Sequence, residues 1–92
     1  ETIFNMKEID YDYNVRVGDT LIVGESYDDD VVCLIGKRLE VIKYEEDEDE
    51  DGSVNIWLTT IDTDNFQYTF EIDMLKAVVY RPEFIFNENM YD

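Results

Sequence analysis

The sequence predicts one small domain of mostly β structure, or a related α+β fold. We expect an antiparallel sheet or a small barrel with at most one short helical turn. The 92 residues suffice for one hydrophobic core and are too few for two. Several short segments alternate between apolar and polar residues, and turn-forming residues separate them. No segment carries the sustained apolar stripe of an amphipathic helix, so residues 1–92 are expected to form a single, mainly β domain.

The first predicted strand covers residues 7–17, where apolar and polar side chains alternate throughout. Gly18 and Asp19 predict a turn, after which residues 20–23 form a short strand. The first strand would therefore have one acidic face and one apolar face. Its polar positions are Glu8, Asp10, Asp12, Asn14 and Arg16, and its apolar positions are Ile9, Tyr11, Tyr13, Val15 and Val17.

Two further strands flank a run of seven consecutive acidic residues at 45–51. Residues 38–44 predict the strand before this run, and residues 54–61 predict the strand after it. The run ends in an Asp-Gly step, which is a strong turn signal. Since consecutive like charges are usually solvated, we expect residues 45–52 to form a mobile, hydrated hairpin tip.

The clearest alternation in the chain lies in residues 66–73, where aromatic and β-branched residues occupy every second position. Residues 62–65 contain Asp and Asn and predict a tight turn. This turn connects residues 54–61 directly to residues 66–73. An antiparallel hairpin is therefore predicted for the two segments.

The end of the chain predicts a short strand and a tail. Residues 74–76 are expected to form a single helical or 3₁₀ turn, and residues 77–80 a short apolar strand. Pro82 lacks the backbone N–H that a central strand needs, so we expect the strand to stop there. Residues 83–92 would then form an irregular C-terminal tail.

The segment VRVGDTLIV at residues 15–23 resembles the opening of SH3-like barrels, where a Gly-Asp turn leads into a core strand. The helical turn expected at residues 74–76, shortly before a late strand, is also similar to that class. This resemblance implies a small barrel. Other all-β or β-rich arrangements fit the same patterns, so the barrel and the open sheet both remain alternatives.

Charge is the outlying feature of the composition. The chain has 24 Asp and Glu against 7 Lys and Arg, no His, and a formal net charge of -17. Direct binding to nucleic acid or to anionic membranes is disfavoured, because both require positive charge on the protein. Solubility needs a net charge of only about 2 to 8 for a small domain. The excess therefore points to a basic partner protein.

The single cysteine, Cys33, excludes an internal disulfide and favours a reducing compartment. Its neighbours are Val and Leu, so we expect a buried and unreactive thiol. The first residues show no secretory signal pattern. The expected location is the cytoplasm.

The acidic run partly matches an EF-hand calcium loop beginning at Asp47, with Gly52 at the sixth position. The twelfth position, which should supply a bidentate Glu, is Leu58. The flanking segments also alternate like strands, whereas an EF-hand has two flanking helices. We therefore expect no metal site and no cofactor.

Catalytic motifs are missing from the sequence as well. Without His there is no His-based triad, and the two serines, Ser26 and Ser53, lie in predicted turns. Carboxylate pairs are so numerous that choosing one as an acid–base dyad would be arbitrary. Trp57 and the tyrosines are expected to be core or protein-interface residues. We expect a protein that is not an enzyme.

Acidic residues recur along the whole chain. On one face of a strand, alternate side chains lie about 6.6 to 6.8 Å apart. This is comparable to the separation of neighbouring phosphates along a DNA strand, so such rows could imitate the backbone of DNA. The candidate phosphate-mimicking residues are Glu8, Asp10, Asp12, Asp28, Asp29, Asp30, Glu45, Glu46, Asp47, Glu48, Asp49, Glu50, Asp51, Asp62, Asp64, Glu71 and Asp73.

In length, charge, aromatic content and dispersed acid pairs, the whole chain resembles the small acidic DNA-mimic proteins of phages, such as the anti-restriction nuclease (Arn) family of T4-type phages. The resemblance implies an inhibitor that occupies the DNA-binding surface of a host restriction endonuclease or nucleoid-type protein. It also implies a homodimer and, for a phage-encoded protein, a location in the host cytoplasm.

Two other functions remain open. The first is an SH3-like adaptor or structural subunit that binds a basic peptide through an aromatic groove. The second is an acidic chaperone for basic proteins, which would show little selectivity among partners.

Overall fold

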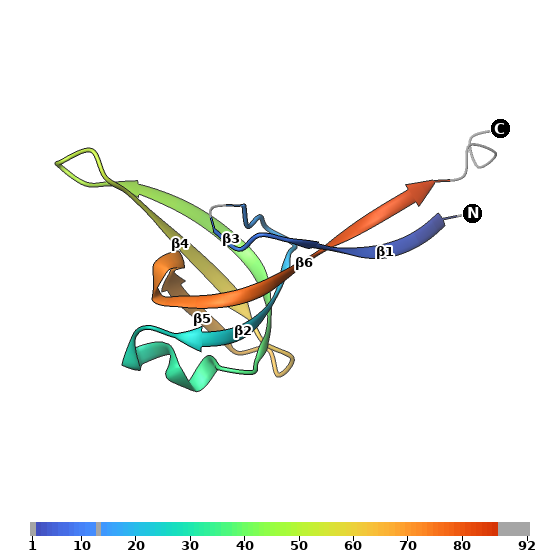
Figure 1. Ribbon diagram of the computed structural model, residues 1–92, viewed down its shortest axis with the longest axis horizontal. Coiled ribbons are helices and arrows are strands. Elements are labelled where there is room, and N and C mark those ends of the chain that lie inside the picture. Colours follow the sequence, from blue (N-terminus) through green and yellow to red (C-terminus); the bar gives the residue numbers. More distant parts are fainter. Residues whose placement is uncertain (1, 13, 87–92) are drawn as a thin grey trace.

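In the described part of the chain, six strands form one antiparallel sheet in the order β1-β6-β2-β3-β4-β5 (Figure 1). The computed structural model describes residues 2–12 and 14–86, and for residues 2–6 and 83–86 it describes the backbone. The mostly β prediction is confirmed, and the sheet is of the open kind, with β1 and β5 at its edges. The strands are β1 (Thr2–Ile9), β2 (Thr20–Ser26), β3 (Arg38–Glu48), β4 (Val54–Ile61), β5 (Gln67–Glu71) and β6 (Leu75–Phe86). Two 3₁₀ segments, η1 (Asp29–Leu34) and η2 (Ile72–Met74), join them.

β3 and β4 form a long hairpin that extends away from the core (Figure 1). Its register runs from Glu40 opposite Ile61 to Glu48 opposite Val54. The strand before the turn is therefore four residues longer than predicted, and the turn itself is shorter than residues 45–52. Cross-strand hydrogen bonds to β4 continue into the acidic run, which explains the extension. The expected mobility of the tip stays a prediction.

The hairpin predicted from the strongest alternation is present. β4 and β5 pair from Ile61 opposite Gln67 to Trp57 opposite Glu71. β5 ends at Glu71, and the 3₁₀ turn η2 follows immediately, two residues earlier than expected. The short helical turn that supported the SH3-like resemblance is present before the last strand, here in an open sheet.

The predicted end of the last strand at Pro82 is wrong, because β6 continues through this residue to Phe86. β2 begins at Thr20, which lies opposite Tyr80. Beyond that point β6 pairs with β1, with Met6 opposite Pro82. The missing N–H of Pro82 therefore does not interrupt a second ladder of hydrogen bonds. The tail predicted for residues 83–92 is in fact strand up to residue 86, and residues 87–92 lie outside the described part of the chain.

The single strand predicted for residues 7–17 is also wrong. β1 ends at Ile9, and the chain then leaves the edge of the sheet. Tyr11 and Val15 still bury their side chains, whereas Val17 is 58% exposed. The Tyr11 hydroxyl donates a hydrogen bond to the Ile72 carbonyl at 2.7 Å. The alternation thus reflects two buried side chains, Tyr11 and Val15, in an irregular segment. Tyr13 lies outside the described residues.

The core lies on the inner face of the sheet. Strands β2 to β6 contribute alternate residues to it, and η1, η2 and the segment after β1 complete it. Each fully buried Val, Leu, Ile or Phe contributes about 1.5 to 3 kcal/mol relative to exposure, which is the main source of stability. The buried hydrophobic residues are Tyr11, Val15, Leu21, Val23, Val31, Leu34, Leu39, Val41, Ile56, Leu58, Phe70, Ile72, Leu75, Ala77 and Val79.

The 3₁₀ segment η1 was not predicted. Asp28 caps its start, where one carboxylate oxygen accepts a hydrogen bond from the Asp30 N–H at 2.8 Å. Because a 3₁₀ helix has about three residues per turn, Val31 and Leu34 share the buried face. Cys33 falls off this face and is exposed, so the expectation of a buried thiol is wrong.

Candidate interaction surface

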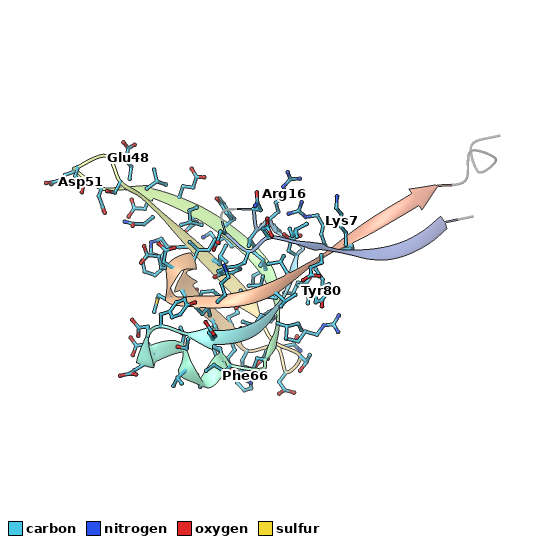
Figure 2. All side chains as sticks on the ribbon, in the orientation of Figure 1. Lys7, Arg16, Glu48, Asp51, Phe66 and Tyr80 are labelled. Carbon is cyan, nitrogen blue, oxygen red and sulfur yellow. The ribbon has the colours of Figure 1, made fainter. Side chains whose placement is uncertain are left out.

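Residues 45–51 form the most concentrated charged feature, which we call the acidic arm. All seven side chains are exposed. Figure 2 shows Glu48 and Asp51 at the far end of the β3–β4 hairpin, away from the core. Glu46 lies opposite the buried Ile56 and Glu45 opposite the exposed Trp57, so successive acids of β3 point to opposite faces. The arm therefore presents carboxylates on both sides.

Local hydrogen bonds hold the end of the acidic arm. Gly52 adopts a φ of 87° at the turn, a conformation that favours glycine. The Asn55 side-chain amide donates to Asp49 at 2.9 Å, and the Ser53 N–H donates to Asp51 at 2.9 Å. This backbone hydrogen bond from Ser53 is the main cause that lowers the pKa of Asp51. The turn thus stabilises the Asp51 carboxylate in its charged form.

Some of the candidate acids already form ion pairs with lysine side chains of the same chain. Lys43 contacts Glu45 at 2.8 Å between Nζ and Oε1, and both side chains are well exposed. Lys76 contacts Asp12 at 3.0 Å, and this hydrogen bond raises the pKa of Lys76. Exposed pairs of this kind are weak, so an incoming basic side chain could replace either cation.

The acids before the first turn do not form the predicted row. Glu8 lies at the end of β1, whereas Asp10 and Asp12 follow the strand. All three are exposed and, together with Lys76, border a shallow hollow of about 260 Å³. The regular strand spacing therefore does not apply to them, although the structure brings them together.

The acids at residues 28–30 lie at the start of η1, away from the acidic arm (Figure 1). All three are exposed. One carboxylate oxygen of Asp28 is used in the cap of η1, which leaves Asp29 and Asp30 as the more available charges. Asp64 in the β4–β5 turn and Asp73 in η2 are exposed too, and Glu71 is half-buried.

Asp62 is an exception among the candidates, because its side chain is 4% exposed. The carboxylate accepts hydrogen bonds from the N–H groups of Asp64 and Phe66 and from the Tyr68 hydroxyl at 2.8 to 3.1 Å. Lys37 lies 3.6 Å away. Burial opposes the charged form, but these donors and Lys37 outweigh it and lower the pKa of Asp62. Asp62 therefore organises the turn, and the prediction that it faces a partner is wrong.

Trp57 lies on the outer face of the sheet and is 37% exposed. Its neighbours on either side are Glu45 on β3 and Glu71 on β5. A shallow hollow of about 530 Å³ adjoins it, lined by Glu45, Glu46, Asp47, Trp57 and Thr69. Trp57 is thus not a core residue, and the interface interpretation of its role stays a prediction.

No local pattern indicated the ion pair between Asp19 and Arg81. Asp19 is 1% exposed, and the Arg81 guanidinium contacts both of its carboxylate oxygens at 2.9 and 3.0 Å. The hydrogen bond to Asp19 is the main cause that raises the pKa of Arg81. In the sequence, Asp19 indicated a turn alone, because its partner lies 62 residues away.

The described residues contain no candidate metal site and no candidate membrane-spanning helix. Across residues 2–12 and 14–86, no group of three or more acidic, Cys or His side chains is arranged to hold a metal ion. The segments on both sides of the acidic loop are the strands β3 and β4, whereas an EF-hand has helices there, so the match to an EF-hand fails. No helix within these residues is long and apolar enough to span a membrane.

Comparisons of this chain with known protein families, curated proteins and solved structures find no match. The observations that bear on the function of the candidate surface are therefore its charge, its exposed residues and the geometry of the sheet.

Proposed function

We propose that this protein is an acidic DNA mimic that binds the DNA-binding surface of a basic host protein and blocks its access to DNA. The observation that carries this proposal is the acidic arm, in which a regular strand displays consecutive carboxylates on an exposed hairpin. The proposed partner is a restriction endonuclease or nucleoid-type protein, as the resemblance to phage DNA mimics implies. No chemistry by the protein itself is required.

The spacing within β3 supports this proposal. Glu45 and Asp47 share one face of the strand, and Glu46 and Glu48 share the other. Each pair is separated by about 6.6 to 6.8 Å, which suits Lys and Arg side chains arranged to contact successive phosphates. The net charge of -17 would attract such a partner over a longer range and increase the association rate.

The acids at the start of η1 and beside β1 extend the negative surface beyond the acidic arm. A larger protein could therefore contact several of these clusters at once. We further propose that two copies associate as a homodimer, which would double the charged surface. Analytical ultracentrifugation over a range of concentrations tests this part, and a monomer at all concentrations would contradict it.

Competition for DNA tests the main proposal. Candidate DNA-binding proteins are saturated with labelled duplex DNA, the acidic protein is titrated in, and DNA release is measured at two salt concentrations. We expect stoichiometric displacement from selected DNA-binding proteins that weakens at the higher salt, because salt screens exposed charges. Lack of displacement from every protein of a broad panel would overturn the proposal.

A stepwise series of charge-neutral variants separates the mimic from the adaptor. The first variant carries Asp47→Asn and Glu48→Gln, and the second adds Asp29→Asn and Asp30→Asn. For a mimic that uses several clusters, we expect inhibition to weaken at each step. The adaptor hypothesis instead predicts no DNA displacement and little dependence on these exposed acids. Urea unfolding of each variant confirms that the fold is retained.

A further inference from the structure

The outer face of β3, β4 and β5 combines an exposed aromatic ring with negative charge on both sides. Trp57 occupies the central strand, with Glu45 directly opposite on β3 and Glu71 directly opposite on β5. Directly opposed residues of neighbouring antiparallel strands have Cβ atoms about 4.5 to 5.5 Å apart. The indole ring is therefore placed between two carboxylate side chains.

Neighbouring contacts support this assignment of the outer face. Ile56 and Leu58, on either side of Trp57 in the chain, are both buried, so Trp57 points away from the core. Two residues farther along β4, the hydroxyls of Thr59 and Thr69 lie 3.1 Å apart across β4 and β5. They continue the same face, which is polar. Trp57 is thus a large apolar side chain in a polar, acidic setting.

An arginine side chain fits this arrangement chemically. Its planar guanidinium can stack on an indole ring while its N–H groups donate to carboxylates at the edge of the ring. A lysine ammonium can make the charge contacts but not the planar stacking. Trp and Arg are also the residue types most often found at energetic centres of protein interfaces.

Among the charges around Trp57, Glu45 and Asp47 are available to such a ligand, whereas Glu71 is half-buried and its side chain also caps η2. Lys43 pairs with Glu45, but these side chains are 61% and 55% exposed, so the pair is weak and open to exchange. Asp47 lies on the same face of β3 and lines the hollow beside the ring. Their negative charge is complementary to a guanidinium.

We propose that Trp57, Glu45 and Glu71 form a binding site for an arginine side chain of the basic partner. This inference rests on the proposed function, because it assumes a basic protein as the partner. It adds a specific contact centre to a surface whose other acids act through distributed charge. The partner segment would place one arginine over the indole ring and further basic residues along the acidic arm.

Trp57 is the only tryptophan, so its fluorescence reports directly on the site. Hexa-arginine, hexa-lysine and an uncharged Gly-Ser peptide are titrated into the intact protein. We expect a saturable change with hexa-arginine, a weaker response with hexa-lysine, and none with the Gly-Ser peptide. Equal affinity for the arginine and lysine peptides would overturn the proposal.

A matched pair of double variants locates the binding. Glu45→Gln with Glu71→Gln removes two charges at the site, and Asp29→Asn with Asp30→Asn removes two exposed charges at η1. We expect the first variant to weaken hexa-arginine binding about 5- to 10-fold and the second variant to weaken it less than about 2-fold. The reason is that a charge next to the bound arginine attracts it more strongly than a distant charge that salt screens. Gln retains the size and hydrogen-bonding capacity of Glu, and urea unfolding verifies folding.

Isothermal titration calorimetry of Trp57→Leu tests the ring itself. We expect this variant to lose the preference for arginine over lysine while keeping weak binding of both peptides. Equal losses in the two double variants, together with continued DNA displacement, would overturn the arginine site and leave the mimic intact. Site-specific peptide binding without DNA displacement would instead support the arginine site and reject mimicry.

Discussion

The buried carboxylate of Asp19 gives the sharpest test of how this fold is held together. It accepts hydrogen bonds from two nitrogens of Arg81 and from the Arg16 N–H, at 2.8 to 3.0 Å. Arg81 also donates to the Asn14 carbonyl at 2.7 Å. These hydrogen bonds of the Asp19–Arg81 ion pair therefore connect the irregular segment between β1 and β2 to strand β6. Asp19→Asn removes the charge and keeps the volume of the side chain.

Breaking a buried ion pair by changing one partner typically costs about 3 to 5 kcal/mol. The Arg81 side chain is 27% exposed, so water can partly solvate its guanidinium after the change. Asn also retains one oxygen that can accept a hydrogen bond. We therefore expect Asp19→Asn to lower the free energy of unfolding by about 2 to 3 kcal/mol, against a total of about 5 to 15 kcal/mol for a typical domain.

Urea unfolding, followed by circular dichroism at neutral pH, measures this loss. Asp64→Asn serves as the matched control, because it makes the same chemical change at an exposed turn residue. The control should change stability by less than about 0.5 kcal/mol. If the two variants unfold at the same urea concentration, the buried pair contributes little and the reasoning is refuted.

Four further outcomes follow from single features of the structure. Tyr11→Phe removes the buried hydrogen bond to the Ile72 carbonyl and should cost about 1 to 2 kcal/mol in urea unfolding, and an unchanged midpoint would contradict this. The pKa of Asp62 is lowered in the folded state, so its ionised carboxylate stabilises the fold at pH values above the ordinary pKa of 3.8. This stabilisation is lost as the pH falls through the lowered pKa of the folded state. The stability difference between wild type and Asp62→Asn should therefore shrink in acid, and a constant difference would refute the assignment. Added sodium chloride should raise the urea midpoint by screening the net charge of -17, whereas a fall would show that ion pairs dominate. Asn65 has a φ of 68°, so Asn65→Ala should destabilise by about 1 kcal/mol and Asn65→Gly much less, as thermal unfolding would reveal.

Local sequence patterns determined the fold class and much of the strand content. Alternation in residues 66–73, preceded by a turn and by the strand expected at residues 54–61, predicted the β4–β5 hairpin because both strands and their connection are adjacent in the chain. The Asp51–Gly52 signal likewise marked the turn that follows β3. Composition alone gave the excess of negative charge and the expectation of a basic partner.

Features that depend on distant contacts needed the tertiary structure. Pro82 lies within β6 because β1, from the other end of the chain, is its neighbour there. Asp62 and Asp64 are both turn aspartates in sequence, yet only the position of Lys37 and Tyr68 distinguishes the buried one from the exposed one. Likewise, alternation cannot show which side chains face Trp57.

The sequence by itself therefore determined that this protein is a highly acidic, mainly β domain, because charge and two-residue periodicity are local properties. The tertiary structure decided which acids are exposed, which are bound internally and which lie beside Trp57. Glu45 and Glu71 lie opposite Trp57 because the strand register pairs this residue with positions 12 residues before it and 14 residues after it. Register is fixed by burying one face of the whole sheet, so no single segment contains that information.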